Sequence, residues 1–254
     1  MAAKDTWDPQ QYQRFSAERD QPFLDLLGLL QPDDRPAVVD LGCGDGRLTA
    51  LAHERLGARS TLGIDSSESM LGGAPEAGGL RFELGDIGRW TDPGRYDVVL
   101  ANASLHWVPD HGDVLSRWAG SLAGGGQLAV QVPANADHPS HTLVAEVAAE
   151  LRIDVEPDPV AVNVLPPVAY AELLDGLGAA GQSVRLQVYA HHLGSSADVV
   201  EWVKGTTLTR VRRAADDDTY AAFLDRYRRR LVDAVGDRAP YAYFFKRILF
   251  WARF

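Results

Sequence analysis

The chain has 254 residues, of which 46% are apolar and 24% are charged, and its formal net charge is −10 at neutral pH. This length allows one large domain or two small ones with a sizeable core, and the composition is that of a soluble globular protein. The excess of acidic residues disfavours nonspecific binding to nucleic acids or anionic membranes, which requires a basic surface. It does not exclude an anionic small-molecule substrate, because a few buried arginines can make the electrostatic potential of a binding site positive.

Cys43 is the only cysteine in the sequence, so no disulfide can form within the chain, and a cytoplasmic location is favoured. The N-terminal residues lack the apolar core of a signal peptide. No apolar run approaches the ~20 residues that a membrane-spanning helix needs. The sequence therefore predicts a small-molecule partner, with neither nucleic acid nor membrane, and leaves the oligomeric state open.

The first predicted elements are helical. Apolar residues between positions 12 and 30 recur at helical spacings, and Asp8-Pro9 is typical of a helix start. Pro22 predicts a break between two helices. Residues 1–35 are therefore predicted to form a helical lid.

Strands and helices alternate after Pro36. Short apolar strands are predicted at 37–41, 60–64, 80–84, 96–101 and 127–132, with helices at 48–56, 67–71 and 115–122. This alternation is typical of an α/β fold, a doubly wound and mostly parallel sheet. Residues 36–133 are predicted to form the core of one domain that spans 1–254.

The alternation is interrupted at 134–167, which holds several prolines and one helix. The later predicted elements are a helix at 168–179, a strand at 183–189, charged helices at 196–235 and a last strand at 244–254. The segments 134–167 and 194–240 follow the fifth and sixth strands. They are therefore predicted to be insertions that form a substrate lid.

The strongest local motif is VVDLGCGDG, residues 38–46, in which a strand runs into three glycines at alternate positions. Glycine allows a sharp turn and a close approach of a ligand to the backbone. The spacing differs from the G-x-G-x-x-G of dinucleotide-binding proteins and favours a ligand without phosphate. Asp40 would then meet an ammonium group, directly or through water. A strand-to-helix turn without a ligand is the alternative.

Three polar residues follow the ends of successive strands. Asp65 lies roughly 20 residues after the glycine turn, where an acid accepts hydrogen bonds from ribose hydroxyls. An Asp before two serines is also a common helix cap. Asp86 can accept from an exocyclic amine of adenine beside the Ile87 amide, and Asn102 closes the fourth strand. Because open α/β sheets bind ligands at this edge, the residues together predict a nucleoside site.

These segments resemble the class I S-adenosylmethionine-dependent methyltransferases over about residues 37–132. The matching segments are VVDLGCGDG, GIDSS, GDI, YDVVLANASLHW and LAGGGQLAV. The resemblance implies a seven-stranded Rossmann-like sheet with an antiparallel last strand, and S-adenosyl-L-methionine as cofactor. The cofactor-binding residues that it implies are Tyr12, Arg19, Asp40, Gly42, Cys43, Gly44, Asp65, Ser66, Met70, Asp86, Ile87, Asn102, Ala103 and Leu105.

A narrower resemblance extends from Trp7 to Leu208. The segments WDPQQYQRFSAERDQPFLDLL, ANASLHWVPDH, VQVPANADHPSH and VEWVKGTTL are similar to those of trans-aconitate methyltransferases. It implies an O-methyltransferase that forms a monomethyl ester on a small polycarboxylate, most simply trans-aconitate. His106 stands where that family has glutamine, and Asp45 where proline is usual.

A carboxylate nucleophile needs no general base, because its pKa of ~4–5 leaves it ionised at neutral pH. We therefore expect no catalytic side chain beyond those that orient the reactants, with His106 and His111 as alternative bases. A polycarboxylate needs cations, and arginine binds carboxylates with two parallel bonds. The predicted substrate-binding residues are Arg19, as the best candidate, and His106, Trp107, His141, Lys204 and Arg210. No metal site is predicted.

Other functions stay open on the sequence alone. One is a methyltransferase of specialised metabolism that acts on a hydroxyl, an amine or a carbon. Another is a protein that binds the cofactor without catalysis. A nicotinamide-dependent dehydrogenase is disfavoured, because the G-x-G-x-x-G spacing is missing.

Overall fold

The computed structural model describes residues 16–31 and 34–254. These residues form two compact units. Unit 2 contains 17–133, 163–187 and 247–254, and unit 1 contains 134–162 and 188–246 together with Ser16. No helix of the described residues is long and apolar enough to cross a membrane.

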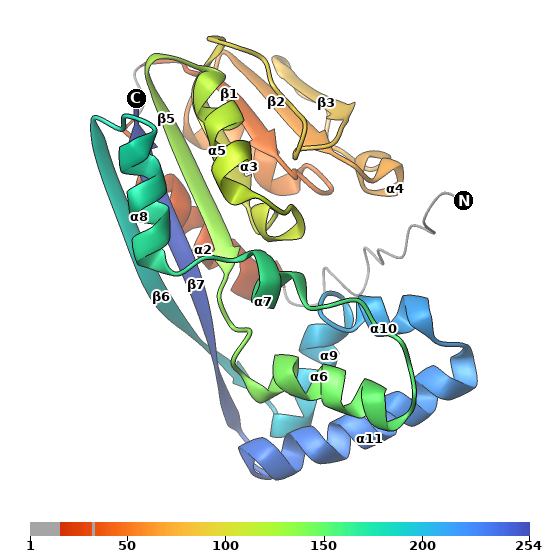
Figure 1. Cartoon of the computed structure of the whole chain (residues 1–254). Coiled ribbons are helices and arrows are strands. Elements are labelled where there is room, and N and C mark those ends of the chain that lie inside the picture. The colour runs from red at the N-terminus through yellow and green to blue at the C-terminus, as the bar shows by residue number, and fades with distance from the viewer. Residues whose placement is uncertain (1–15, 32–33) are drawn as a thin grey trace. The chain divides into compact units, whose positions relative to one another are not determined.

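A single sheet of seven strands has the order β3-β2-β1-β4-β5-β7-β6 (Figure 1). The strands are β1 (Ala37–Leu41), β2 (Ser60–Asp65), β3 (Leu80–Leu84), β4 (Tyr96–Asn102), β5 (Leu122–Pro133), β6 (Gly181–Leu193) and β7 (Tyr241–Arg253). Strands β1 to β5 pair in parallel, and β7 runs antiparallel to β5. The predicted doubly wound sheet with an antiparallel last strand is confirmed.

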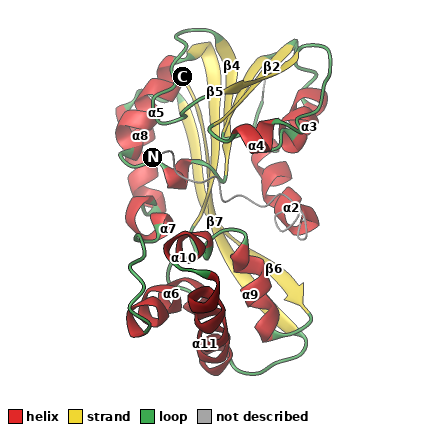
Figure 2. Cartoon of the chain, turned by 90° about the vertical axis from the view of Figure 1, so that its right-hand side faces the viewer, coloured by secondary structure: helices red, strands yellow, loops and turns green. Residues whose placement is uncertain are grey.

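Helices cover both faces of the parallel strands in unit 2. They are α2 (Ser16–Leu27), α3 (Arg47–Arg55), α4 (Glu68–Leu71), α5 (His111–Gly120) and α8 (Pro167–Gly176), with a 3-10 turn η1 (Leu105–Trp107) after β4. Figure 2 shows α3 and α4 on one side of the sheet, and α5 and α8 on the other. All five residues of β1 are buried, as expected for a parallel strand covered on both faces.

Unit 1 is mostly helical. Its helices are α6 (Pro139–Glu150), α9 (Val199–Lys204), α10 (Thr209–Ala214) and α11 (Asp217–Val235), with the 3-10 turn η2 (Ser196–Asp198) and most of α7 (Pro159–Asn163). Phe223, Tyr227 and Leu231 recur every four residues along α11, so one face of the helix enters the core. That core also contains Val144 and Trp202.

Two predicted details were wrong. Helix α2 continues through Pro22, and the burial of Phe23 and Leu26 offsets the backbone hydrogen bond that proline cannot make. Strand β5 begins at Leu122, before the predicted position 127, because an irregularity in its pairing with β4 accommodates the glycine run. The charged region 196–235 is helical, as predicted, and consists of η2, α9, α10 and the longer α11.

Candidate functional site

The glycine turn after β1 requires glycine at three positions. Gly42, Gly44 and Gly46 have φ values of 82°, 59° and 75°, which L-residues with a side chain rarely adopt. A Cβ atom on Gly42 would lie 2.2 Å from the Cβ of Ser104, which follows β4. The turn therefore brings the ends of β1 and β4 into direct contact.

Asp40 is a buried carboxylate whose hydrogen bonding is incomplete. It is 3% exposed, and its Oδ2 accepts a hydrogen bond of 2.6 Å from the Thr49 hydroxyl. Its Oδ1 has no hydrogen-bond partner among the described residues. Burial raises the pKa of Asp40 to about 6. The hydrogen bond from Thr49 lowers this pKa, and the negative charge of Asp65 raises it. A positively charged donor at Oδ1 would stabilise the ionised form.

Asp65, at the end of β2, accepts hydrogen bonds from two different turns. Its Oδ2 accepts from the Gly44 amide at 2.8 Å, and its Oδ1 accepts from the Ser67 amide at 2.9 Å. Ser67 caps α4 by accepting from the Met70 amide. The methyl end of Met70 lies 3.3 Å from where a Cβ on Gly44 would be. The structure thus brings together the predicted residues Cys43, Gly44, Asp65, Ser66 and Met70.

The loop after β3 carries the predicted adenine contacts. The Asp86 side chain accepts from the Gly88 amide at 2.9 Å and is otherwise largely exposed. The indole of Trp118 on α5 donates to the Ile87 carbonyl at 3.0 Å. Asp86 therefore keeps carboxylate oxygen capacity for a ligand, while α5 holds the loop in place.

The end of β4 has two features that are typical of a ligand site. The Oδ1 atom of Asn102 is buried and has no hydrogen-bond partner within the described part of the chain. Ala103 has a left-handed φ of 54°, and its amide donates to the Gln131 carbonyl at 2.9 Å. Such a conformation costs energy in a residue with a side chain and is often found at functional sites.

His111 is fully engaged in holding the turn η1. One ring nitrogen, Nε2, lies 3.0 Å from the carbonyl oxygen of Leu105, so it must be the donor. The other, Nδ1, accepts from the Tyr170 hydroxyl at 2.8 Å. Burial lowers the pKa of His111, although nearby carbonyls and a carboxylate raise it. The ring is therefore neutral and has no free nitrogen to act as a base.

The predicted substrate residues are divided between the units. His106 and Trp107 lie in η1 of unit 2, with ring centroids 4.7 Å apart. His141, Lys204 and Arg210 lie in unit 1. The Lys204 ammonium is already paired with Glu201 at 2.6 Å on the same helix, which reduces its value for binding an anion. Tyr12 and the side chain of Arg19 lie outside the described residues, although the Arg19 backbone belongs to α2.

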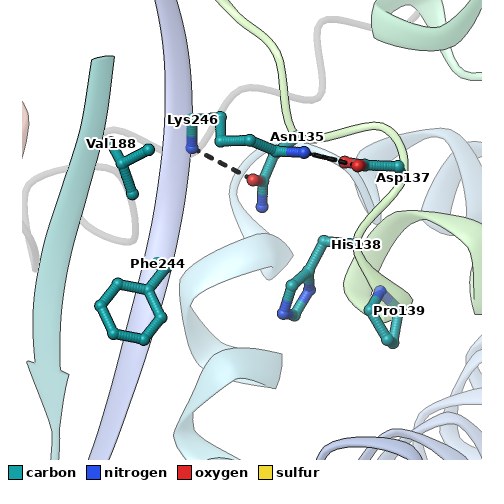
Figure 3. Close-up of a pocket in the computed structure, with 7 residues that line it drawn as sticks. All are labelled: Asn135, Asp137, His138, Pro139, Val188, Phe244 and Lys246. Carbon is teal, nitrogen blue, oxygen red and sulfur yellow. Dashed lines mark hydrogen bonds and ion pairs between the residues drawn. The ribbon is translucent and has the colours of Figure 1, made fainter. Parts of the chain in front are cut away.

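Unit 1 also has a pocket of about 300 Å³ (Figure 3). Its lining residues are Asn135, Asp137, His138, Pro139, Val188, Phe244 and Lys246. The Lys246 ammonium, which is the basic group of this lining, pairs with Asp137 at 2.5 Å. Burial lowers the pKa of His138 to about 4, so it is neutral at pH 7. The pocket therefore offers no free positive charge to an anionic substrate.

Sequence reasoning missed four residues that complete these sites. Thr49 bonds Asp40, Ser104 donates to the Leu41 carbonyl at 2.5 Å, Tyr170 bonds His111, and Asp158 bonds His141. Ser104 stands inside the quoted segment ANASLHW, so its place after β4 was a usable signal. The other three meet their partners 9, 59 and 17 residues away. No local pattern marks such pairs.

Comparisons with known proteins give a consistent result. Residues 38–126 match the family described as "Methyltransferase domain". The chain is 42% identical to a trans-aconitate 2-methyltransferase of Deinococcus radiodurans, over 97% of this chain and 98% of that protein. It is 40% identical to a protein of the same name from Streptomyces avermitilis, over 92% of this chain and 91% of that protein.

Solved structures share the fold. A Haemonchus contortus phosphoethanolamine N-methyltransferase 2 in complex with S-adenosyl-L-methionine has a TM-score of 0.59 at 15% identity, covering 92% of this chain and 52% of that one. A geranyl diphosphate C-methyltransferase from Streptomyces coelicolor has a TM-score of 0.53 at 17% identity, covering 96% and 80%. At these identities the likeness shows the fold alone.

Proposed function

The chain belongs to the family of trans-aconitate 2-methyltransferases, and from this premise we propose that it esterifies one carboxylate of trans-aconitate with the methyl group of S-adenosylmethionine. The substrate assignment is supported by how much of the chain aligns with trans-aconitate 2-methyltransferases. Relatives that are 37–42% identical align along nearly the whole chain, through unit 1 as well as unit 2. The enzyme is an S-adenosylmethionine-dependent methyltransferase.

The residues of unit 2 fit this cofactor. Asp40 and Asn102 each carry a buried oxygen without a partner in the described residues, and a ligand with an ammonium group and hydroxyls supplies donors. Asp65 keeps lone pairs for a ribose diol, since each of its oxygens accepts one described bond. The glycine turn leaves the backbone open to close approach. When bound, the cofactor supplies a methyl group that is already activated on a sulfonium.

The chain's own part in the reaction is to orient and to exclude water. A substrate carboxylate is ionised at neutral pH and attacks without a general base. The engagement of both His111 nitrogens agrees with this. Burial, reinforced by the charges of Asp40 and Asp65, raises the pKa of the Cys43 thiol far above its usual range. That thiol therefore stays protonated and does not compete as a nucleophile.

The proposal includes substrate contacts by Arg19, His106, Trp107, His141, Lys204 and Arg210. It also includes a single domain, a cytoplasmic location, and lids formed by residues 1–35, 134–167 and 194–240. What supports the contacts in unit 2 is that His106 and Trp107 lie in η1, the turn that follows the end of β4.

The experiment is an assay of the purified chain with isotopically labelled S-adenosylmethionine. The panel contains trans-aconitate, other di- and tricarboxylates, phenols and amines, and mass spectrometry identifies the product. We expect one labelled methyl group on trans-aconitate, released by mild base as an ester is. Labelling of a phenol, an amine or a carbon instead would contradict the proposal. Cofactor binding without any product would indicate a non-catalytic protein.

A further inference from the structure

Gln131, on β5, is a fully buried side chain whose hydrogen bonding is incomplete. It is 0% exposed, and its Oε1 accepts from Nη1 of Arg247 on β7 at 3.1 Å. Because a guanidinium only donates, this bond fixes which end of the amide is the oxygen and which is the nitrogen. The amide nitrogen Nε2 has no hydrogen-bond partner among the residues that the structure describes. Such a buried donor costs free energy unless a ligand supplies an acceptor.

Gln131 lies at the ligand edge of unit 2. It pairs in register with Asn102, the last residue of β4, and its carbonyl accepts from the Ala103 amide at 2.9 Å. Residues in register on neighbouring strands point to the same face of a sheet, and so do residues two apart along one strand. Asp40 is in register with Leu100, two residues before Asn102. The side chain of Gln131 is therefore on the same face as the two acceptors that fit the cofactor.

Arg247 adds a positive charge beside Gln131. It is 7% exposed, and Leu249, two residues later on β7, is the register partner of Gln131, so the Arg247 side chain is on the same face. The hydrogen bond to the Gln131 oxygen does not neutralise the guanidinium, because an amide has no net charge. Arginine stays protonated in proteins and is well suited to carboxylates. A permanent cation and an amide donor thus lie side by side towards the end of β5.

We propose that Gln131 and Arg247 form an anion site that binds one carboxylate of the substrate. Nε2 of Gln131 donates a hydrogen bond to this carboxylate, and the Arg247 guanidinium supplies the charge. This inference rests on the proposed function, because it takes the substrate to be a polycarboxylate. The whole site belongs to unit 2, as do the proposed cofactor residues. At neighbouring strand ends, Asn102 offers an acceptor to the cofactor and Gln131 a donor to the substrate.

The carboxylate bound here is one that does not react. A charged hydrogen-bond donor withdraws electron density from a carboxylate and makes it a poorer nucleophile. The carboxylate that attacks the methyl group is therefore better left free of the guanidinium. A tricarboxylate has two others that can be held, so the site selects substrates by their additional charge.

Gln131→Glu is the decisive variant. It replaces the Nε2 donor with an oxygen of similar size, keeps an acceptor for Arg247 and adds a negative charge that neutralises the guanidinium. Gln127→Glu is the matched control, because Gln127 lies on the same face of β5 and is 2% exposed. Its Oε1 accepts from the Gln31 amide and the Trp251 indole, both at 2.8 Å, and a carboxylate keeps these bonds. The control therefore carries the cost of a new buried carboxylate four residues before the proposed site.

The assay crosses these variants with trans-aconitate and its three monoamides, each with a different carboxylate replaced by a primary amide. The wild type should discriminate against one methylated monoamide by about ten- to hundredfold in kcat/KM, mainly through KM. Gln131→Glu should lower kcat/KM for trans-aconitate by about a hundredfold and bring that ratio towards one. Gln127→Glu should keep the wild-type ratio. Calorimetric binding of S-adenosylhomocysteine checks that each variant is folded.

Three results overturn the proposal. The first is a wild type that discriminates against no methylated monoamide. The second is a folded Gln131→Glu variant that keeps the wild-type ratio. The third is a loss of S-adenosylhomocysteine affinity in Gln131→Glu as large as the loss of kcat/KM, since Gln131 would then serve the cofactor.

Substitutions of Arg247 decide the case in which Gln131→Glu does not fold. Arg247→Met keeps an apolar stem and removes the charge, so the discrimination should disappear. Arg247→Lys keeps the charge without the planar fork, so part of the discrimination should remain. Wild-type ratios in both variants overturn the proposal. Equal losses in both overturn it as well, because they assign the effect to packing on β7 rather than to charge.

The wild-type assay also tells the two proposals apart. If the enzyme methylates a different polycarboxylate, the assignment of trans-aconitate fails, and the same analysis with amides of that substrate still decides the role of Gln131. If it methylates only amines or phenols, the proposed function and this inference both fail. If it methylates trans-aconitate and the variants keep the wild-type ratio, only this inference fails.

Discussion

The two units differ in the polar side chains that they leave incompletely bonded. In unit 2 two acceptor atoms without a described partner, Oδ1 of Asp40 and Oδ1 of Asn102, lie at the ends of adjacent strands. The nitrogen donors Nε of Arg117 and Nε2 of Gln131 in the same unit also lack a described partner. In unit 1 one such atom is the ring Nε2 of His141. The two acceptors at the strand ends suit a ligand that donates hydrogen bonds, which agrees with the cofactor contacts proposed for unit 2.

Burial shifts the pKa of one carboxyl group in unit 2 and of one histidine in unit 1 in opposite directions. Burial is the main cause that raises the pKa of Asp40 in unit 2 to about 6. Asp40 therefore stabilises the folded state at pH values below its usual pKa, and this contribution is lost as the pH rises through 6. Burial lowers the pKa of His138 in unit 1 to about 4, so its contribution is present above its usual pKa of 6.5 and is lost as pH falls towards 4. Acidification therefore strengthens the contribution of Asp40 and removes that of His138.

Gly42→Ala should have the largest effect, and it should fall on unit 2. The new Cβ would meet the Cβ of Ser104 at 2.2 Å in a left-handed backbone, so either the β1 turn or the β4 turn must move. We expect a loss of roughly 3 kcal/mol or more of stability, and no measurable cofactor binding. Gly57→Ala is the matched control, because Gly57 has a φ of 57° but nothing within 4 Å. Thermal unfolding would refute this account if both variants lost the same amount.

Asp40→Asn should weaken cofactor binding most among the polar substitutions. It keeps the size of the side chain and an acceptor for Thr49, but removes the charge that an ammonium group would meet. We expect a loss of about a hundredfold in affinity, from the ~1.5–3 kcal/mol that a charged hydrogen bond contributes. Isothermal calorimetry with S-adenosylhomocysteine measures it, and an unchanged affinity in a folded variant would contradict the ammonium contact.

The same substitution should stabilise the free enzyme at high pH. The wild type must ionise a buried carboxyl whose pKa lies about two units above its usual value, a cost on the order of 3 kcal/mol above pH 6. Asp40→Asn avoids that cost, so its melting temperature should exceed that of the wild type at pH 8 and the gap should close by pH 4. Wild-type cofactor affinity should rise with pH through 6, and the variant should not follow.

Asp65→Ala should have a smaller effect on binding, of ~1–3 kcal/mol. Part of it comes from lost bonds to the ribose hydroxyls. The rest comes from the Gly44 and Ser67 amides, which lose their acceptor. Asp86→Ala is a useful comparison, since the Asp86 side chain is mostly exposed and accepts one described backbone bond. Equal losses for the two variants would argue against a ribose contact of Asp65.

The sequence predicts unit 2 far better than unit 1, for a physical reason. Parallel strands covered on both faces are continuous apolar runs, and the ligand edge follows from strand ends, so Asp40, Asp65 and Asn102 could be placed together in advance. Unit 1 is built from 134–162 and 188–246, whose contacts join distant residues. His141 and Arg210 were named as isolated cations. Asp158, which bonds His141, carried no local signal.

The smallest expected effect concerns Thr49, which bonds the one Asp40 oxygen that has a partner. Thr49→Val keeps the shape of a fully buried side chain and removes the hydroxyl, so that neither carboxylate oxygen of Asp40 has a described donor. Because that bond lowers the pKa of Asp40, its loss should move the pH dependence of cofactor binding to higher pH. At pH 7 the affinity should fall only severalfold, by about 1 kcal/mol, and Thr49→Ser should restore it. The same variant should leave the KM for the substrate unchanged at saturating cofactor. A change in that KM would mean that the effect of Thr49 is not confined to cofactor binding.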